Sequence, residues 1–378
     1  MTQNASSVNL PRGFGRGVCQ RTYDKRARPP QGHHPGRVFL KESYDDDEPL
    51  WQKLGSFVGF GSQDDPGHWN NSPEWFGQQG GGWGRNIGNV VFERMSPMNG
   101  LVQVTSHPAS LLGSEKYAEW RVLRFNGITR QSVTRLHDRE GVICMDATCL
   151  AAEYLKTVAS LVSSWMGFRR GDDESVEMLA IGIGGGSMPM FLRHYFPLMT
   201  IDAVEIDPVV IEAAQSCMGF PRCDERLCVF VEDAAVFVQE QQLKKQYDFI
   251  YIDAFDGEDC IPEDLCGEEF IQGIDSMLHP ENGVLVMNFH ENDPRAHATA
   301  HQFHRIIQGT SFTISCRVQR NFILCCSKST DLADLTSDDL KRMIKSSASF
   351  VSQKLGVPFS MGERATADFS LLSIPKNT

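Results

Sequence analysis

The chain has 378 residues, of which 41% are hydrophobic, so it can bury a substantial core and hold a catalytic domain of ordinary size with further segments. Its formal net charge of −12 argues against general nucleic-acid binding, which needs basic patches. No apolar run approaches the roughly 18 residues of a membrane span, and no signal-peptide pattern opens the chain, so we expect neither a nucleic acid nor a membrane among its partners.

The eleven cysteines are scattered, mostly in apolar surroundings, and no two have the C-x-x-C spacing. This pattern predicts buried, reduced thiols and no metal site. Reduced thiols indicate a reducing compartment, so we expect a cytoplasmic protein.

Residues 1–86 are rich in Gly, Pro, Asn, Gln and Ser and lack aliphatic periodicity, which predicts a largely disordered tail. The first forty residues carry seven Lys or Arg residues and one acid, Asp24. We favour a solvated tail for this basic segment. The alternative is an organellar presequence, which has the same acid-poor composition.

From residue 87 onward the chain becomes rich in strand patterns. Four stretches are strand-like: 89–94, 101–104, 120–125 and 128–133. Asn126 and Gly127 give a strong hairpin-turn signal between the last two. A helix is expected from about 149 to 165. Residues 87–172 are therefore predicted to form a small antiparallel β subdomain plus a helix, whose sheet edges leave a homodimer open as a partner.

The most informative stretch runs from Met178 to Ser187, where an apolar strand ends in alternating glycines at 182, 184 and 186. A helix is expected at 188–195, and a second apolar strand at 201–208 contains Glu205. Strand, glycine turn, helix, strand and acid together build a nucleoside-binding crevice, in which the acid holds the ribose hydroxyls.

The spacing of the glycines narrows the choice of nucleoside. A dinucleotide fingerprint needs G-x-G-x-x-G, but the third glycine position is Ser187 in one register and Pro189 in the other. The form that fits is G-x-G-x-G, which suits a ligand without a diphosphate, such as S-adenosylmethionine or its decarboxylated relative. The alternative is a glycine turn in an α/β protein that binds nothing.

Three further strands follow, at 228–231, 247–252 and 284–288. Asp233 and Asp253 come just after the first two of them, and Asp233 lies where a carboxylate can accept a hydrogen bond from an adenine amine. The ends of parallel strands line one crevice, so Glu205, Asp233 and Asp253 are expected to face the same ligand.

A helix at 294–308 and a strand pair at 312–318 and 321–326 complete this region. We therefore predict an α/β fold with a Rossmann-like sheet, of the class I methyltransferase type, over 173–330. Residues 331–378 are predicted to form a C-terminal helical extension with an irregular end.

Several of these motifs resemble the spermidine-synthase-like methyltransferases, in particular the C-terminal domain of the methyltransferase-like protein 13 family. The resemblance is carried by residues 183–189 (IGGGSMP), 201–208 (IDAVEIDP) and 253–257 (DAFDG), and it extends over about 120–330. It implies S-adenosylmethionine as the cofactor. It also implies a protein amine as the acceptor, because the best-known members methylate a translation factor, elongation factor 1-alpha, on a lysine or the N-terminal amine.

The resemblance also implies roles for individual residues. On the cofactor side, Gly182, Gly184 and Gly186 would face the methionine part, Glu205 the ribose, and Ile206, Asp233 and Ala234 the adenine. Asp253 would lie next to the transferable group, with Asp256 near it, and Gln131 and Tyr154 would lie on the substrate side. His290, after the strand at 284–288, is a further candidate for the substrate side, and the favoured alternative for it is a surface histidine with satisfied hydrogen bonds. An amine with a pKa of about 10.4 arrives protonated, so Asp253 and Asp256 are candidates to bind the ammonium and remove its proton. The alternative for Asp256 is a turn cap.

Aminopropyltransferases, which use decarboxylated S-adenosylmethionine to make spermidine, share the resemblance and are the alternative function. This sequence departs from their pattern at Ser187, at Lys156 and over 257–259, where they carry acids or a different loop. A diamine needs several carboxylates to offset its desolvation, so we rank aminopropyl transfer second. A non-catalytic relative that acts as a binding scaffold comes third.

Overall fold

The computed structural model describes residues 88–109, 111–127, 129–168, 175–256, 260–316 and 320–372. The tail expected over 1–86, the basic segment within it and residues 257–259 lie outside this part of the chain. Within the described ranges, no helix is both long and apolar enough to cross a membrane.

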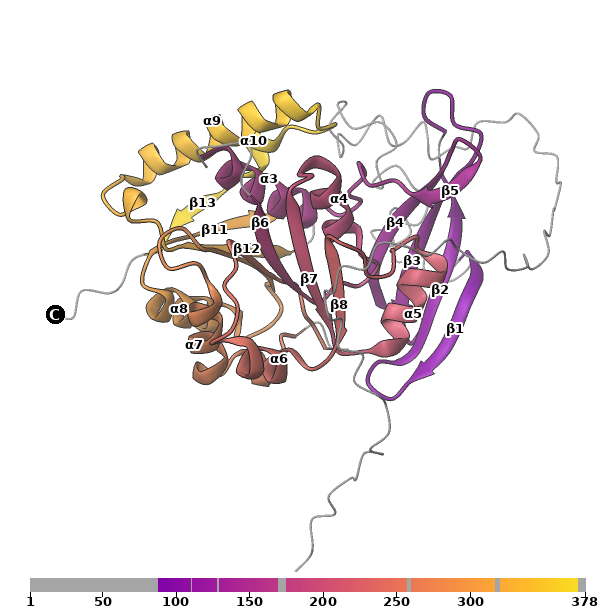
Figure 1. Ribbon diagram of the computed structural model, residues 1–378, viewed down its shortest axis with the longest axis horizontal. Helices are drawn as coiled ribbons and strands as arrows, with labels where there is room; N and C mark the ends of the chain where they lie inside the picture. The colour runs from indigo at the N-terminus through magenta and orange to yellow at the C-terminus, as the bar shows by residue number, and fades with distance from the viewer. Residues whose placement is uncertain are drawn as a thin grey trace, which may run out of the picture. The chain divides into compact units, whose positions relative to one another are not determined.

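The first sheet is a five-stranded antiparallel sheet with the order β1-β2-β3-β4-β5 (Figure 1). Its strands are β1 (Asn89–Ser96), β2 (Gly100–Pro108), β3 (Ala118–Phe125), β4 (Thr129–Arg139) and β5 (Val142–Met145). As the sequence predicts, Asn126 and Gly127 connect β3 to β4, and both have positive φ, 51° and 69°. Positive φ at both residues suits the tight reversal of the chain, and the pairing of Phe125 with Thr129 leaves three residues between the two strands. The short β5 was not predicted from the sequence.

The second sheet has eight strands in the order β13-β11-β12-β10-β9-β6-β7-β8. The strands are β6 (Val176–Ile181), β7 (Met199–Glu205), β8 (Leu227–Val231), β9 (Phe249–Ile252), β10 (Val284–His290), β11 (Thr310–Cys316), β12 (Asn321–Ser327) and β13 (Phe369–Leu371). Strands β6 to β10 pair in parallel, whereas β11, β12 and β13 pair antiparallel. The predicted Rossmann-like α/β sheet with an antiparallel β subdomain is confirmed.

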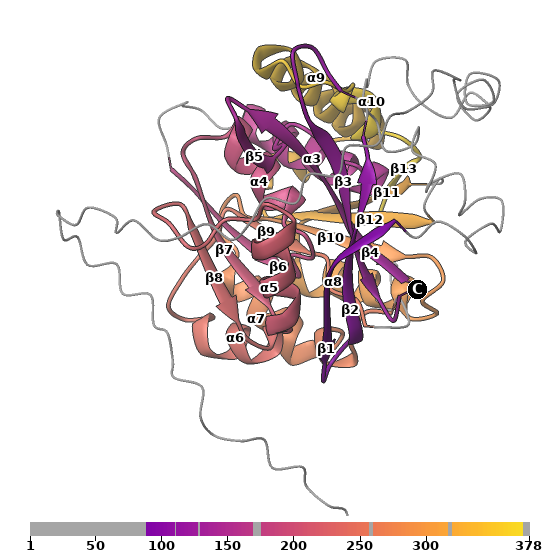
Figure 2. The same cartoon turned by 90° about the vertical axis from the view of Figure 1, so that its right-hand side faces the viewer.

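Helices cover both faces of this sheet (Figures 1 and 2). They are α3 (Glu153–Phe168), α4 (Ser187–Tyr195), α5 (Pro208–Cys217), α6 (Ala234–Gln241), α7 (Glu268–Met277), α8 (Ala296–Ile307), α9 (Ser337–Leu355) and α10 (Met361–Arg364). Met178 and Ala180 of β6 pack with α3, α4 and α9, while Leu179 and Ile181 pack with α6, α7 and α8. A strand with both faces buried reads as a continuous apolar run, which explains the sequence 178–181.

The first sheet packs against α5 (Figure 2). Val102 and Leu123 share a buried cluster with Val210. Asp207, which caps α5, also accepts a hydrogen bond of 2.6 Å from the Ser96 hydroxyl at the end of β1. These contacts hold the subdomain beside the start of α5, just after the carboxyl end of β7.

The boundaries of several elements differ from the sequence prediction, most clearly at α3 and in the C-terminal segment. Helix α3 begins at Glu153 rather than near 149, and α9 begins at Ser337 rather than 331. The cap of α9 is Thr336, whose hydroxyl accepts from the Asp339 amide at 3.2 Å. The irregular end predicted after α9 is wrong at β13, which pairs with β11.

The buried His304 makes the stability of the fold depend on pH. Its side chain on α8 is 6% exposed, and neither ring nitrogen has a hydrogen-bond partner among the described residues. Burial, with a smaller contribution from His301, lowers the pKa of His304 below its ordinary value of 6.5. The unfolded chain therefore binds a proton below pH 6.5 that the folded protein does not.

We predict that the contribution of His304 to the free energy of unfolding falls as the pH drops from 7 to 5, so that the change in stability over this interval is less unfavourable in a His304→Leu variant than in wild type. Urea denaturation midpoints at both pH values measure the effect. His297→Leu, on the exposed side of the same helix, is the matched control. An equal loss of stability in wild type and His304→Leu would contradict the prediction.

Candidate active site

The carboxyl ends of β7, β6 and β9 meet at one edge of the sheet. The amide of Gly182, just after β6, donates to the Val204 carbonyl at 2.9 Å, and the amide of Asp253 donates to the Ile181 carbonyl at 2.9 Å. The chain proceeds from β6 to β7 and β8 on one side and to β9 and β10 on the other. Such a reversal of strand order opens a crevice for a ligand.

The three glycines after β6 serve different purposes. All have positive φ, 78°, 50° and 82° at 182, 184 and 186. A Cβ atom on Gly182 would collide with the Asp253 carbonyl oxygen, and one on Gly184 would lie 3.1 Å from the Ser132 Cβ atom. A Cβ on Gly186 would collide with the Phe220 ring. Only the first two glycines line the crevice, so the position expected for Gly186 needs correction: Gly186 allows packing against Phe220 instead.

A cavity of about 650 Å³ lies at this edge, a volume typical of small-molecule sites. Every predicted site residue except Gly186 lines it. These residues are Gln131, Tyr154, Gly182, Gly184, Glu205, Ile206, Asp233, Ala234, Asp253, Asp256 and His290. Residues from both sheets therefore surround one space.

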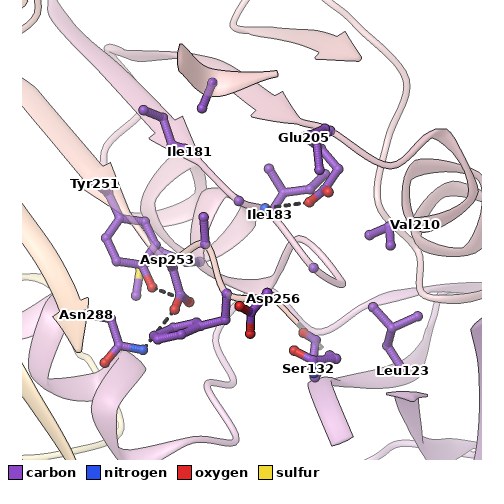
Figure 3. Close-up of a pocket in the computed structure, with 18 of the residues that line it drawn as sticks. Leu123, Ser132, Ile181, Ile183, Glu205, Val210, Tyr251, Asp253, Asp256 and Asn288 are labelled. Carbon is purple, nitrogen blue, oxygen red and sulfur yellow. Dashed lines mark hydrogen bonds between the residues drawn. The ribbon is translucent and has the colours of Figure 1, made fainter. Parts of the chain in front are cut away.

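Glu205 ends β7, and its carboxylate is held against the glycine turn (Figure 3). Its Oε2 accepts from the Ile183 amide at 3.2 Å, and its Oε1 accepts from the Asp207 amide at 3.1 Å. The side chain is largely buried, and this burial raises the pKa of Glu205. The carboxylate is thus fixed beside the cavity, with its orientation set by main-chain donors.

Asp233 and Ile206 lie at the ends of the neighbouring strands. The Oδ1 atom of Asp233 caps α6, accepting from the Ala235 amide at 2.7 Å and the Val236 amide at 3.4 Å. Ile206 is 40% exposed and contributes an aliphatic surface to the cavity wall. A carboxylate next to an aliphatic wall can accommodate a flat ring with a polar edge.

Asp253 is the centre of a hydrogen-bond network (Figure 3). Its Oδ2 accepts from the hydroxyls of Tyr251 at 2.6 Å and Tyr154 at 3.1 Å, and its Oδ1 accepts from the Asn288 amide at 2.8 Å. The Asn288 carbonyl oxygen accepts in turn from the Asn321 amide at 3.0 Å. Burial raises the pKa of Asp253, and the three hydrogen bonds partly offset that rise.

Tyr251, Asn288 and Asn321 were not among the site residues predicted from the sequence. Tyr251 lies on β9, two residues before Asp253, which directly follows the strand. The two-residue period of a strand therefore places both side chains on the same face. Asn288 is a polar residue inside an apolar strand, and it is 2% exposed. Both signals were present in the sequence, but the hydrogen bond from Asn321 to Asn288 depends on the antiparallel register of β10 and β12, which places the two residues diagonally across the strand pair.

Asp256 and His290 lie farther along the cavity wall. The Oδ1 atom of Asp256 accepts from the Cys260 amide at 3.0 Å, and its own amide donates to the Cys260 carbonyl at 2.9 Å. The turn-capping alternative for Asp256 is therefore observed, while its side chain also lines the cavity. The Nδ1 atom of His290 accepts from the Asn292 amide at 3.3 Å.

Lys156 does not lie at the position predicted from the sequence. Its ammonium group is buried, 3.2 Å from Glu153 and 5.8 Å from the centre of the Phe359 ring, and Lys156 does not line the cavity. The prediction that this charge weakens a diamine site is therefore wrong, because the side chain of Lys156, the fourth residue of α3, points into the helical layer. Ser187 does line the cavity, at the first residue of α4.

Comparisons with known proteins agree with this fold. Residues 166–317 match the spermine/spermidine synthase domain. The eEF1A lysine and N-terminal methyltransferase of Bos taurus is 36% identical over 119 residues, which cover 29% of this chain and 17% of that protein. The polyamine aminopropyltransferase of Vibrio vulnificus is 44% identical over 113 residues, which cover 29% of this chain and 36% of that protein. The chain thus spans well under half the length of these curated relatives.

A solved structure supports the fold over a longer stretch. A probable spermidine synthase from Corynebacterium glutamicum superposes with a TM-score of 0.53 at 16% identity, covering 77% of this chain and 99% of that one. At this level of identity the likeness establishes the shared fold, including the sheet and its helical layers.

We predict that Gly182→Ala lowers the free energy of unfolding by about 3 kcal/mol, because it combines a positive φ with a main-chain collision. The matched control is Gly356→Ala, since Gly356 has a φ of 65° but no atom within 4 Å of an added Cβ. That control should cost about 1 kcal/mol. Urea denaturation compares the two. A Gly182→Ala variant no less stable than Gly356→Ala would show that the approach of Asp253 is not a tight constraint.

Proposed function

We propose that this chain, whose residues 166–317 form a spermidine-synthase-like domain, is an S-adenosylmethionine-dependent methyltransferase that acts on a protein amine. The observation that carries the proposal is the single cavity. It combines the glycine turn at 182–184, the carboxylate of Glu205 and the buried carboxylate of Asp253. A sulfonium nucleoside and an amine acceptor need these three features together.

The cavity residues fit the cofactor. Gly182 and Gly184 expose main chain to the methionine part. The Glu205 carboxylate can bind the ribose hydroxyls. Asp233 offers a carboxylate and Ile206 an apolar surface to the adenine. S-adenosylmethionine supplies a methyl group that its positively charged sulfur makes electrophilic. The protein must hold the acceptor in line, about 3 Å away, and exclude water.

Asp253 is suited to prepare an amine acceptor. A lysine or N-terminal amine that enters as an ammonium ion can donate to the Asp253 carboxylate, which then takes its proton. Tyr154, Tyr251 and Asn288 fix the orientation of that carboxylate. Asp256 lies along the same wall and can pass the proton to solvent. The curated methyltransferase relatives, named for eEF1A, support a protein acceptor such as a translation factor.

Aminopropyl transfer is the second candidate, and a specific observation favours it. Asp256 and Asp264 line the same cavity as Asp253, so carboxylates are present to offset the charge of a diamine. Ser187 in the glycine turn, where aminopropyltransferases have an acid, argues in the other direction.

Incubation with cell extract and radiolabelled S-adenosylmethionine tests the two candidates. We expect label in a protein band, and we expect Asp253→Asn to lower this labelling at least about 100-fold, as the loss of a general base does, while cofactor affinity is kept. Asp338→Asn, on the exposed surface of α9, is the matched control. Spermidine formed from putrescine and the decarboxylated cofactor, without labelled protein, would reverse the ranking. If neither cofactor form binds, the third hypothesis, a non-catalytic binding scaffold, is favoured.

The pH profile tests the role of Asp253 separately. Because the Asn288 hydrogen bond lowers the pKa of Asp253, its removal should raise that pKa further. We predict that Asn288→Ala shifts the acidic limb of the kcat profile to higher pH, with activity recovering on the alkaline side. Asn321→Ala should shift it in the same direction by less, since Asn321 acts through Asn288. An unshifted acidic limb in both variants would mean that Asp253 does not act as the base.

A further inference from the structure

The first turn of α3 connects the cavity to the C-terminal segment of the chain. Tyr154, the second residue of α3, lines the cavity and donates its hydroxyl to Asp253 Oδ2 at 3.1 Å. Glu153, the first residue, has its Oε2 atom 3.0 Å from the Nη2 atom of Arg364 on α10. Helix α10 packs against α3 and α9 (Figure 1). Neighbouring residues of one helical turn therefore contact the site on one side and α10 on the other.

The position of this turn determines whether the Tyr154 hydrogen bond forms. The first amides of a helix have no acceptor within the helix, so a helix end frays more readily than its interior. At 3.1 Å, the hydrogen bond to Asp253 is at the long end of the range for O–H···O contacts, which is about 2.5–3.0 Å. A small outward movement of the turn would therefore break it.

Arg364 is the group that ties this turn to another element. Lys156 also contacts Glu153, with 3.2 Å between its Nζ atom and Glu153 Oε1, but Lys156 belongs to the same helix. The side chains of Arg364 and Glu153 are each 19% exposed. Their ion pair is thus largely shielded from water, where it is stronger than a pair of exposed charges.

The core of the protein fixes the position of Arg364. Its Cζ atom lies 5.5 Å from the centre of the Phe359 ring, a distance at which a guanidinium group is attracted to the ring face. Phe359 is 3% exposed, and its ring stacks with that of Phe191 on α4, with 5.9 Å between the ring centres. Arg364 therefore gives the start of α3 a fixed anchor.

We propose that Arg364 is a positioning residue for the reaction: through Glu153 it holds the first turn of α3, and it thereby keeps the Tyr154 hydroxyl on Asp253. This inference rests on the proposed function, in which Asp253 is the base. Arg364 is not among the described residues that line the cavity. Glu153 and Arg364 also lie outside residues 166–317, so the matched domain does not contain this ion pair.

Fluorine NMR of the full chain labelled with 3-fluorotyrosine tests the positioning without any reaction. The chain has seven tyrosines, and the Tyr154 signal is the one that a Tyr154→Phe variant lacks. Arg364→Met removes the charge but keeps an apolar stem against Phe359. We expect this variant to shift or broaden the Tyr154 signal. Arg364→Lys keeps a positive charge for Glu153 and should leave the signal nearer to its wild-type position.

The groups around Asp253 determine what the pH profile of the reaction should show. The Tyr154 hydrogen bond lowers the pKa of Asp253, so its loss raises that pKa. Tyr251 also donates to Asp253, and Cys316 of β11 lies near Tyr154. Burial raises the pKa of Tyr251 and of Cys316, so both groups stay protonated at acidic pH. Asp256 lines the same cavity.

The acidic limb of the kcat profile therefore reports on the Tyr154 hydrogen bond. We expect Arg364→Met to move this limb to higher pH, because Asp253 then stays protonated to higher pH. In a Tyr154→Phe background, Arg364→Met should cause no further movement, since two residues that act through one contact are not additive. Glu153→Gln breaks the same ion pair from α3 and leaves Arg364 on Phe359, so it should reproduce the effect if Arg364→Met fails to fold.

Lys345→Met is the matched control. Lys345 on α9 pairs with Glu363 at 2.6 Å, one residue before Arg364, and both side chains are exposed. This variant breaks an ion pair between α9 and α10 and should leave the Tyr154 signal and the acidic limb unchanged. If Arg364→Met loses stability but neither the signal nor the limb moves, Arg364 has a structural role only and the inference is overturned.

The inference and the proposed function fail in different ways. If wild type methylates protein but Arg364→Met leaves the Tyr154 signal and the acidic limb at their wild-type positions, the inference is wrong and the proposed function stands. If wild type labels no protein but the Tyr154 signal moves in Arg364→Met and not in Lys345→Met, the proposed function is wrong and the positioning of Tyr154 by Arg364 is supported.

Discussion

The contact between Gly182 and the main chain of Asp253 is the constraint on which the site depends. Any side chain at 182 would collide with the Asp253 carbonyl, and β9 would have to move away from β6. That pairing holds Asp253 on one side of the central strand, while the Gly182 amide bonded to Val204 holds Glu205 on the other. The absence of a side chain at Gly182 therefore lets the two strands carry the Glu205 and Asp253 carboxylates to the same cavity.

These two carboxylates are buried in different ways, and the difference suits different tasks. Glu205 accepts hydrogen bonds from main-chain amides, which fix it as part of the fold. Asp253 accepts from three side chains on three elements, α3, β9 and β10. The pKa of Asp253 therefore depends on three side chains, each of which can be substituted without altering the backbone. A fixed anion suits the binding of a sugar, and a tunable one suits proton transfer.

Short sequence patterns predicted most of the residues that line the cavity, but not the tertiary contacts around them. The glycine spacing and the acids after successive strands could be recognised because the strand ends of a parallel sheet must converge. Gly186 was assigned to the cavity because the sequence cannot show that Phe220, 34 residues later, packs on it. Lys156 was placed beside the site because it follows Tyr154 closely in the sequence. Its side chain instead points toward Phe359, a contact that sequence spacing cannot show. Gln131 is an extra residue of β4 with no partner on β3, and this bulge depends on the register of the two strands, which no local pattern fixed.

Calorimetric titration of S-adenosylmethionine into wild type and Glu205→Gln tests whether the nucleoside binds beside the glycine turn, with Glu240→Gln on the exposed side of α6 as the matched control. We expect binding to wild type and to the control, and an affinity at least about tenfold weaker for Glu205→Gln, as for the loss of one charge-assisted hydrogen bond to a ribose hydroxyl. Equal affinity in wild type and Glu205→Gln would contradict it, because the nucleoside would then lie somewhere other than beside the glycine turn.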